Sequence, residues 1–469
     1  MISMKGLDMK PVSLELKSDS STPLYMQLYN YIREEITAGR LAAGERLPSL
    51  RLLSKDLGIS VTTVETAYNQ LLVEGYVKSR PQSGYYVAEI GSDSDFPPGI
   101  SREPLNFDTY PFPMPRYRYD IGSFDFVKWK KCLSKVLNEH TRLLLFESDP
   151  QGEEVLRHEI SRYLYSSRGV RCTPNQVVIA AGTQQLTNHL ARIMRKMNIS
   201  HVSTEDPGYM PLQNIFRDLG FTLTNIPVRS DGIEIEKLPA NIPSAVYVSP
   251  SNQFPTGAVM PIGRRYLLLD WARKNDGIIL EDDYDSELRY FGKPVPALQG
   301  LDRNDSVVYL GTFSSTLFPA VKISYMVLPI HMVKIFQEIK GDYDQTCSKE
   351  EQLALAMFME KGYYTTNIKK LRNLYSQKLQ TALSAFAKYG EGFVTTQNTN
   401  SGINITIKVS TRLTPEELCL RGAELSLHVV PVANLIHENT AALIFYYNQV
   451  PLQELDDRIK RMIANWRQG

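Results

Sequence analysis

Residues 306–329 read SVVYLGTFSSTLFPAVKISYMVLP, in which two short apolar runs flank a turn rich in Thr and Ser. Apolar runs of this length that end in turn residues are typical of buried strands. Similar runs occur at VVIAAG (177–182), SAVYVSP (244–250) and GIILEDDYD (277–285), and helical segments such as RRYLLLDWARKN lie between several of them. This alternation predicts an α/β domain with a mainly parallel sheet, covered on both faces.

Ligands of such sheets bind at the carboxyl ends of the strands, so the residues after each run matter most. Gly182, Thr183 and Gln184 follow VVIAA and open a helix. The free N–H groups and positive dipole end of that helix suit an anion such as a phosphate. A tight strand–helix turn without a ligand is the alternative interpretation.

Polar side chains follow two more of the predicted strands. Asp282 and Tyr284 come after GIILE, where a carboxylate can pair with a protonated ring nitrogen and a Tyr can bond a ring hydroxyl. An acidic loop facing solvent explains the same residues equally well. The run VVYL is followed by Thr312, Ser314 and Ser315, with Lys322 seven residues beyond Ser315.

Composition sets broad limits on function. The 469 residues are 43% hydrophobic and 22% charged, with a net charge of +1, so no global field attracts nucleic acid or a membrane. The chain allows roughly three domain-sized units. Scattered cysteines, no long apolar run and no signal-peptide pattern predict a soluble, cytoplasmic protein without a disulfide framework or metal site.

The first ninety residues have a pattern of their own. Apolar residues at helical spacing occur in STPLYMQLYNYIREEITAGRL, in LPSLRLLSKDLGIS and in VTTVETAYNQLLVEGY, and YVKSRPQSGYYVAEI then alternates as a hairpin. This order of elements predicts a winged helix-turn-helix over residues 21–90, whose third helix enters a DNA major groove. A helical dimerisation domain that never touches DNA is the alternative.

Short hydroxyl residues, a basic residue and the wing supply the candidate DNA contacts. These are Ser49, Arg51, Ser60, Thr62, Thr63, Ser83 and Gly84. Between Ser20 and Ile90 seven basic residues are balanced by seven acidic ones, so the electrostatic attraction to DNA is weak. We therefore expect a dimer, whose two halves add their phosphate contacts.

The chain divides into further segments by composition. Residues 1–20 form an N-terminal tail, and the Pro- and Gly-rich stretch at 91–120 reads as a linker. The domain at 121–469 is predicted to have a large part at about 150–330. Its small α+β part combines 121–149 with 331–469.

Several motifs together resemble a known family. The spacing of LPSLRLLSKDLGIS, TTV and SGYYV resembles the GntR family, although Val61 stands where that family often has Arg. AGTQQ, EDPGY, SPSNQFPTG, EDDYDSELRY and GTFSS then follow in the order of fold-type I aminotransferases. Nearly the whole chain resembles the MocR/GabR regulators, which join a GntR winged helix to an aminotransferase-like domain that binds pyridoxal 5'-phosphate.

The resemblance implies roles for individual residues. Thr183 and Gln184 would lie near the cofactor phosphate, and Tyr209 would line the ring pocket. Asp282 would hold the pyridine nitrogen and Tyr284 the 3'-oxygen. The remaining phosphate contacts would be Thr312, Ser314 and Lys322.

One position departs from the family in a way that matters chemically. The residue after GTFS is the family's Schiff-base lysine, and here it is Ser315. A hydroxyl cannot form an imine, and Ser cannot replace the lysine as the base that moves a proton during transamination. We therefore expect no catalytic residue at this position.

Other departures concern phosphate and carboxylate binding. Glu147 and Ser148 replace the Tyr-Gly that usually precedes DPQG, and Lys322 replaces an Arg, keeping the charge without the bidentate fork. Met210 and Pro211 stand where related members can carry an Arg. No Arg or Lys occurs between Gly422 and Asp457, the region that usually supplies a second one.

These observations favour a DNA-binding transcription regulator whose large domain senses an effector. The cofactor is pyridoxal 5'-phosphate or a related vitamin B6 compound, bound without a covalent link if at all. The partners are operator DNA, an unknown small-molecule effector and a second copy in a head-to-tail homodimer. Alternatives are an active aminotransferase with an N-terminal DNA-binding addition, a ligand-free dimerisation scaffold, or a lysine exchanged for Ser315 by design.

Overall fold

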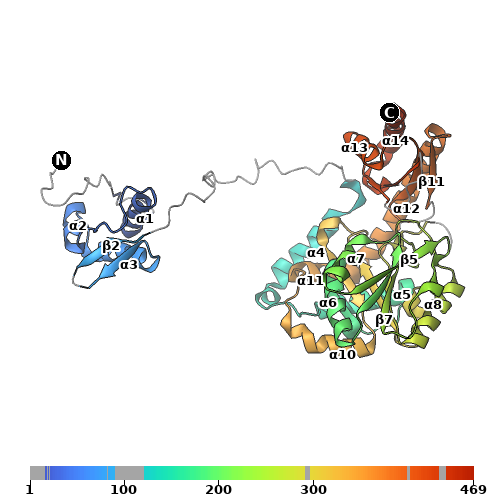
Figure 1. The fold of residues 1–469 in the computed structure, drawn as a ribbon, viewed down its shortest axis with the longest axis horizontal. Helices are drawn as coiled ribbons and strands as arrows, with labels where there is room; N and C mark the ends of the chain where they lie inside the picture. Colours follow the sequence, from blue (N-terminus) through green and yellow to red (C-terminus); the bar gives the residue numbers. More distant parts are fainter. Residues whose placement is uncertain are drawn as a thin grey trace. The chain divides into compact units, whose positions relative to one another are not determined.

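The computed structural model describes residues 16–17, 20, 22–81, 83–89, 121–290, 296–398, 402–432 and 440–468. The chain folds as two compact units, residues 1–112 and 113–469 (Figure 1). The predicted linker at 91–120 and nearly all of the predicted tail at 1–20 lie outside the described residues.

The first unit has three helices and a hairpin. Its elements are α1 (Leu24–Thr37), α2 (Leu50–Leu57), α3 (Val61–Val73), β1 (Val77–Arg80) and β2 (Gly84–Val87). Gly58, with φ of +66°, ends α2 and turns the chain toward α3, a conformation that favours glycine. The predicted order of helix, helix, turn, helix and wing is confirmed.

The core of the first unit explains why α3 is held firmly. Val64, Ala67, Tyr68 and Leu71 share one buried face of α3, and apolar residues of α1, α2 and both strands pack against it. The Tyr68 hydroxyl donates to the Pro48 carbonyl at 3.1 Å. The opposite face of α3 therefore stays available to solvent or to a partner.

The second unit is built on an eight-stranded sheet. In chain order its strands are β3 (Val177–Ala181), β4 (His201–Asp206), β5 (Thr222–Arg229), β6 (Gly232–Ile233), β7 (Ser244–Val248), β8 (Ile278–Asp282), β9 (Val307–Thr312) and β10 (Ile323–Val327). Their order across the sheet is β3-β10-β9-β8-β7-β4-β5-β6. Strands β4, β5, β7, β8 and β9 pair in parallel, whereas β10 is antiparallel to both of its neighbours.

Helices cover both faces of this sheet (Figure 1). Those packed on one face are α6 (Thr183–Lys196), α7 (Met210–Asp218) and α10 (Ile330–Ile339). The other face carries α4 (Phe126–Glu139), α5 (Glu154–Arg168), α8 (Ile262–Asn275) and α11 (Lys349–Glu360). The short α9 (Leu298–Leu301) lies between β8 and β9 in the chain. Successive strand residues alternate between the two cores, because side chains of a strand point to opposite faces.

A smaller antiparallel sheet completes the unit. It contains β11 (Val394–Gln397), β12 (Ile405–Ser410), β14 (Thr440–Phe445) and β13 (Val429–Pro431), in that spatial order. Its helices are α12 (Tyr363–Tyr389), α13 (Pro415–Glu424) and α14 (Leu452–Arg467). Among the described residues, none of the helices has both the length and the apolar character needed to cross a membrane.

The cores divide the second unit differently from the predicted small part, 121–149 with 331–469. Trp129 and Cys132 of α4 and Phe358 of α11 belong to the core of the large sheet. The core of the small sheet takes its helical residues from Leu371 onward. The difference arises because α11 packs against both α4 and α5, which the sequence pattern does not reveal. The other predicted boundaries stay predictions.

Candidate functional site

The carboxyl edge of the large sheet gathers the predicted ligand contacts. Those that follow or end β3, β4, β8 and β9 are Thr183, Gln184, Tyr209, Asp282, Tyr284, Thr312 and Ser314. Lys322 precedes β10, and because β10 runs antiparallel, its amino end lies at the same edge. The strand order therefore brings these backbone positions to one side of the sheet, and their roles as ligand contacts stay predictions.

The N-terminus of α6 has the features of an anion site. Gly182, with φ of +86°, precedes the helix, and no side chain caps it. The N–H groups of Gln185 and Leu186 donate to the Gly182 carbonyl, whereas those of Thr183 and Gln184 have no partner among the described residues. These two N–H groups are available to a phosphate. The side chain of Gln184 is exposed.

A cation and hydroxyls lie beside this helix end. Ile323 pairs with Ala181 across the sheet, so Lys322 comes level with the start of α6. Its ammonium group is exposed and has no ion pair with another described residue. The Thr312 hydroxyl oxygen accepts from the Ser314 N–H at 3.2 Å and from the Ser324 hydroxyl at 2.8 Å. The combination provides a positive charge and preorganised polar groups for an anion.

Asp282 lies at the end of β8, among aromatic side chains. Its carboxylate accepts a hydrogen bond from the buried Tyr247 hydroxyl. Burial raises the pKa of Asp282 to about 7, although the bond from Tyr247 lowers it. Burial also raises the pKa of Tyr209, and the charge of Asp282 adds to that shift. A protonated nitrogen heterocycle would stabilise the ionised form of Asp282.

Tyr284 is fixed by both its side chain and its backbone. Its hydroxyl donates to the Asn252 carbonyl at 3.0 Å and lies 3.3 Å from the Asn252 amide nitrogen. The Ser315 hydroxyl donates to the Tyr284 carbonyl at 2.8 Å. Sequence reasoning missed Asn252, although it lies within the quoted SPSNQFPTG motif. An amide in the turn that follows the buried strand β7 was the available signal.

A buried ion pair supports the turn after β8. Arg168, at the end of α5, lies 2.7 Å from Asp283 through its Nε and 2.8 Å from the Ser251 hydroxyl through Nη2. The Tyr309 hydroxyl donates to the same carboxylate at 2.6 Å. These bonds tie α5 to the turns after β7 and β8 and to Tyr309 within β9. Sequence reasoning also missed Arg168, because nothing local indicates its distant partner.

The same turn connects the site to the small sheet. The Gly402 N–H donates to the Leu288 carbonyl at 3.0 Å, and the Tyr290 hydroxyl donates to the Gly402 carbonyl at 2.6 Å. The Tyr447 hydroxyl also donates to that carbonyl. The segment after Asp282 is therefore hydrogen-bonded to the loop that precedes β12 of the small sheet.

Buried carboxyl groups at this edge predict a dependence of stability on pH. Burial raises the pKa of Glu205 from 4.5 to about 8, and that of Asp282 from 3.8 to about 7. The folded state therefore holds more protons than the unfolded state between about pH 4 and pH 8. We expect the melting temperature of the ligand-free protein to fall by several degrees across this window.

Tryptophan fluorescence measures this unit alone, because Trp129, Trp271 and Trp466 are the only tryptophans in the sequence. A Glu205→Gln variant keeps an acceptor for the Ser249 N–H, which lies 3.2 Å from Glu205. It is expected to flatten the pH profile. A melting temperature of the wild type that rises toward pH 8 would contradict the raised pKa values of Glu205 and Asp282.

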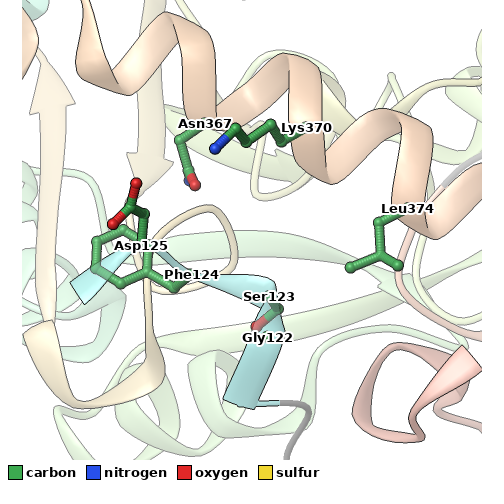
Figure 2. Close-up of a pocket in the computed structure, with 7 residues that line it drawn as sticks. All are labelled: Gly122, Ser123, Phe124, Asp125, Asn367, Lys370 and Leu374. Carbon is green, nitrogen blue, oxygen red and sulfur yellow. The ribbon is translucent and has the colours of Figure 1, made fainter. Parts of the chain in front are cut away.

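A pocket of about 400 Å³ is lined by residues 122–125 and by side chains of α12 (Figure 2). The Asn367 amide donates to the carbonyl of Thr316 at 2.6 Å, which places the pocket wall next to the Ser315 turn. Figure 2 shows Asn367, Lys370 and Asp125 at one end and Leu374 farther along α12. Its lining is mixed, with the charged Asp125 and Lys370 beside the apolar Phe124 and Leu374, and it includes none of the predicted ligand contacts.

In the first unit, several predicted DNA contacts have structural roles. Ser49 caps α2 by accepting from Leu52 N–H at 3.3 Å, and Ser60 caps α3 by accepting from Thr63 N–H at 3.1 Å. The Ser60 and Thr63 hydroxyls also lie 2.7 Å apart. Thr62 is exposed on the first turn of α3, and its hydroxyl has no partner among the described residues.

This difference predicts opposite outcomes for two neighbouring substitutions. Thr62→Ala should weaken binding to a selected DNA duplex by about 1 kcal/mol, close to fivefold, without loss of stability. Ser60→Ala should instead cost about 1 kcal/mol of helix stability. Fluorescence anisotropy measures the first effect, and hydrogen exchange of the α3 amides measures the second. If both variants lost DNA affinity equally and neither was destabilised, Ser60 would be a DNA contact like Thr62 and its cap would not stabilise α3.

The wing offers further contacts. Gly84 begins β2 with φ of +114°, and the Ser83 hydroxyl lies 2.6 Å from the Tyr86 hydroxyl. The Arg80 guanidinium covers the Tyr86 ring, 4.4 Å from its centre. Arg51 is exposed on α2, without an ion pair to another described residue. Their roles as DNA contacts stay predictions.

Two family models match the chain. Residues 24–87 match "Bacterial regulatory proteins, gntR family", and residues 116–402 match "Aminotransferase class I and II". The probable rhizopine catabolism regulatory protein MocR of Rhizobium meliloti is 34% identical over 88% of this chain and 86% of its own length. The chain belongs to the MocR type of transcriptional regulator.

Other relatives of this MocR-type regulator agree. The uncharacterized HTH-type regulator YdeL of Bacillus subtilis is 38% identical over 95% of this chain and 97% of its own length. The pyridoxine biosynthesis regulator PdxR of Corynebacterium glutamicum is 32% identical, covering 78% and 79%. The predicted GntR-type domain and regulator family are confirmed, so the chain is a DNA-binding transcriptional regulator.

Solved structures support the fold of the second unit. The kynurenine aminotransferase of Pyrococcus horikoshii matches 75% of this chain and 89% of its own, with a TM-score of 0.64 and 23% identity. An archaeal alanine:glyoxylate aminotransferase matches 75% and 89%, with a TM-score of 0.66 and 19% identity. The predicted fold-type I aminotransferase-like architecture of this MocR-type regulator is confirmed. At these identities the likeness establishes the fold alone.

Proposed function

We propose that this MocR-type regulator senses pyridoxal 5'-phosphate or a related vitamin B6 phosphate, held without a covalent bond. Occupancy of the pocket changes how the winged units bind an operator. The domain does not transaminate. The observation that carries the proposal is Ser315, which has no amine at the position of the family's Schiff-base lysine and whose hydroxyl donates to the Tyr284 carbonyl.

The residues at the sheet edge fit such a ligand. The open N-terminus of α6 and the exposed Lys322 suit a phosphate, and the buried carboxyl group of Asp282 suits a protonated ring nitrogen. Tyr209 and Tyr284 supply aromatic walls and a hydroxyl. When bound, the cofactor supplies the electron sink for amine chemistry, but the chain offers no lysine at position 315 to begin it.

The neighbouring substitutions also argue against turnover of amino acids. Glu147 and Ser148 stand where the family has a phosphate-binding Tyr-Gly, and no Arg or Lys occurs between Gly422 and Asp457. A substrate carboxylate therefore lacks the expected guanidinium partners. These features favour a receptor over both an active aminotransferase and an empty scaffold, because the ring and phosphate contacts remain.

We also propose a head-to-tail homodimer. Leu145 and Phe146 follow α4 and are 81% and 70% exposed, and Leu143 is 45% exposed. Large apolar side chains grouped on a surface indicate an interaction site. A second copy of the chain could cover them, and a dimer carries two winged units, whose phosphate contacts add and offset the neutral charge of each one.

The test is operator binding with and without ligand. Duplexes selected from a random library by the full-length protein serve as the operator, and anisotropy gives its Kd. We expect saturating pyridoxine 5'-phosphate or pyridoxal 5'-phosphate to change this Kd at least about fivefold, which corresponds to a coupling free energy of about 1 kcal/mol. An Asp282→Ala variant should bind the duplex but lose the response.

Two results would contradict the proposal. If the Kd for the operator duplex did not change while the pocket was shown to be saturated, ligand binding would not regulate DNA binding. Steady turnover of an amino acid and a keto acid by the wild type would make it an enzyme.

A further inference from the structure

The Ser315 hydroxyl has a fixed direction. It lies 2.8 Å from the Tyr284 carbonyl oxygen, and a carbonyl has no proton to give. Ser315 must therefore be the donor in this bond. A hydroxyl has a single proton, so its remaining lone pairs can only accept. Ser315 is half-buried three residues beyond β9, and a ligand that reaches its oxygen would meet an acceptor, not a donor.

The exchange of lysine for serine also leaves space. A lysine side chain extends several atoms beyond the position of the serine Oγ and ends in an ammonium group. In the family this group reaches the 4'-carbon of the ligand. With Ser315 in its place, that volume stays available for a substituent on the ligand itself, or for a water molecule that bridges to the hydroxyl.

Carboxyl groups are also buried along this edge of the sheet. Glu205, Asp282 and Asp285 are buried within this edge of the sheet, and Asp285 accepts from the Asn252 amide at 2.8 Å. The buried Arg168 guanidinium is engaged with Asp283, 2.7 Å away. Burial raises the pKa of Asp282 to about 7 and that of Asp285 well above its ordinary value, so a ligand cation close to them would stabilise their ionised forms. A ligand that brings a positive charge would supply what the absent lysine does not.

Building on the proposed function, we propose that the pocket selects a vitamin B6 phosphate with an aminomethyl group at the 4'-position, pyridoxamine 5'-phosphate, over the aldehyde. The ligand ammonium group donates toward Ser315, directly or through one water molecule, and lies among the carboxyl groups. The regulator then responds to the aminated pool of the vitamin.

The two other forms of the vitamin lack the positive charge at the 4'-position, and one of them also lacks a hydrogen-bond donor there. The aldehyde oxygen of pyridoxal 5'-phosphate is only an acceptor, so it faces the lone pairs of Ser315 without forming a bond. The 4'-hydroxyl of pyridoxine 5'-phosphate can donate but has no charge. The expected order of affinity is therefore aminomethyl, then hydroxymethyl, then aldehyde.

Isothermal titration calorimetry on the full-length protein tests this order with the three compounds. We expect pyridoxamine 5'-phosphate to bind about tenfold more tightly than the aldehyde, the ratio expected of one charge-assisted hydrogen bond. Ser315→Ala should reduce this ratio several-fold, whereas Ser315→Thr, which keeps a hydroxyl, should preserve it. Ser166→Ala is the matched control, because its hydroxyl also donates to a backbone carbonyl, at 2.9 Å, but lies exposed on α5.

The outcomes separate this inference from the proposed function. No binding of any compound would overturn the proposed function. Binding of all three within about twofold, or tightest binding of the aldehyde, would overturn the selectivity and leave the sensor intact. A Ser315→Ala variant that melts like the wild type but loses affinity for all three compounds equally would show that the hydroxyl only shapes the turn.

Discussion

An Arg168→Met variant is expected to lose about 3–5 kcal/mol of unfolding free energy in the second unit. The side chain of Arg168 is buried, and its removal leaves the Asp283 carboxylate without a cationic partner in a site of low dielectric. Tyr309 and Ser286 still donate to that carboxylate, at 2.6 and 2.9 Å, but they carry no charge. Urea titration followed by tryptophan fluorescence measures the loss.

Two further variants identify the cause. Arg171→Met, three residues away on the exposed surface, should change stability by no more than about 0.5 kcal/mol. Arg168→Lys should give an intermediate loss, because it keeps the charge but not the fork. A loss below about 1 kcal/mol in Arg168→Met would show that the ion pair does not hold the turn after β8.

A Ser315→Lys variant is expected to gain a covalent link to pyridoxal 5'-phosphate, from none in the wild type to nearly stoichiometric. The lysine amine condenses with the aldehyde, which a hydroxyl cannot do. The new side chain would enter the space that Ser315 leaves open, beside buried carboxyl groups that balance its charge. A visible absorbance band and a mass increase after borohydride reduction measure the link.

Ser315→Arg is the control for this variant. It adds a cation of similar length that stays protonated and cannot form an imine. It should therefore remain colourless and unmodified at position 315, as located by peptide mapping. Absence of a link in Ser315→Lys, with the fold intact by fluorescence, would contradict a pocket that has kept its shape.

Much of the second unit follows from short-range patterns. Buried runs ending at Ala181, Asp282 and Thr312 predict parallel strands, and parallel strands bring their carboxyl ends to one edge. Lys322 could not be placed in this way. It reaches the edge because β10 inserts antiparallel between β3 and β9, and only the pairing of Ile323 with Ala181 reveals it.

Long-range partners explain what the sequence did not predict. Arg168 and Asp283 are far apart in the chain, and neither has a local signal for the other. Asn252 meets Tyr284 only after both loops have folded. In the winged unit, the sequence does not distinguish among the hydroxyl residues at the start of α3 as DNA contacts. Only the structure shows that Ser60 caps the helix.

Mass spectrometry of the wild-type chain with pyridoxal 5'-phosphate shows whether the ligand binds and whether it is held without a covalent bond. The sample is compared in its native state and after borohydride reduction and denaturation, with peptide mapping of residues 282–329. We expect a ligand adduct on the native protein and no modification of the cleft peptides after denaturation. A covalent adduct on a cleft residue, or a native mass without bound ligand at saturating concentration, would contradict this expectation.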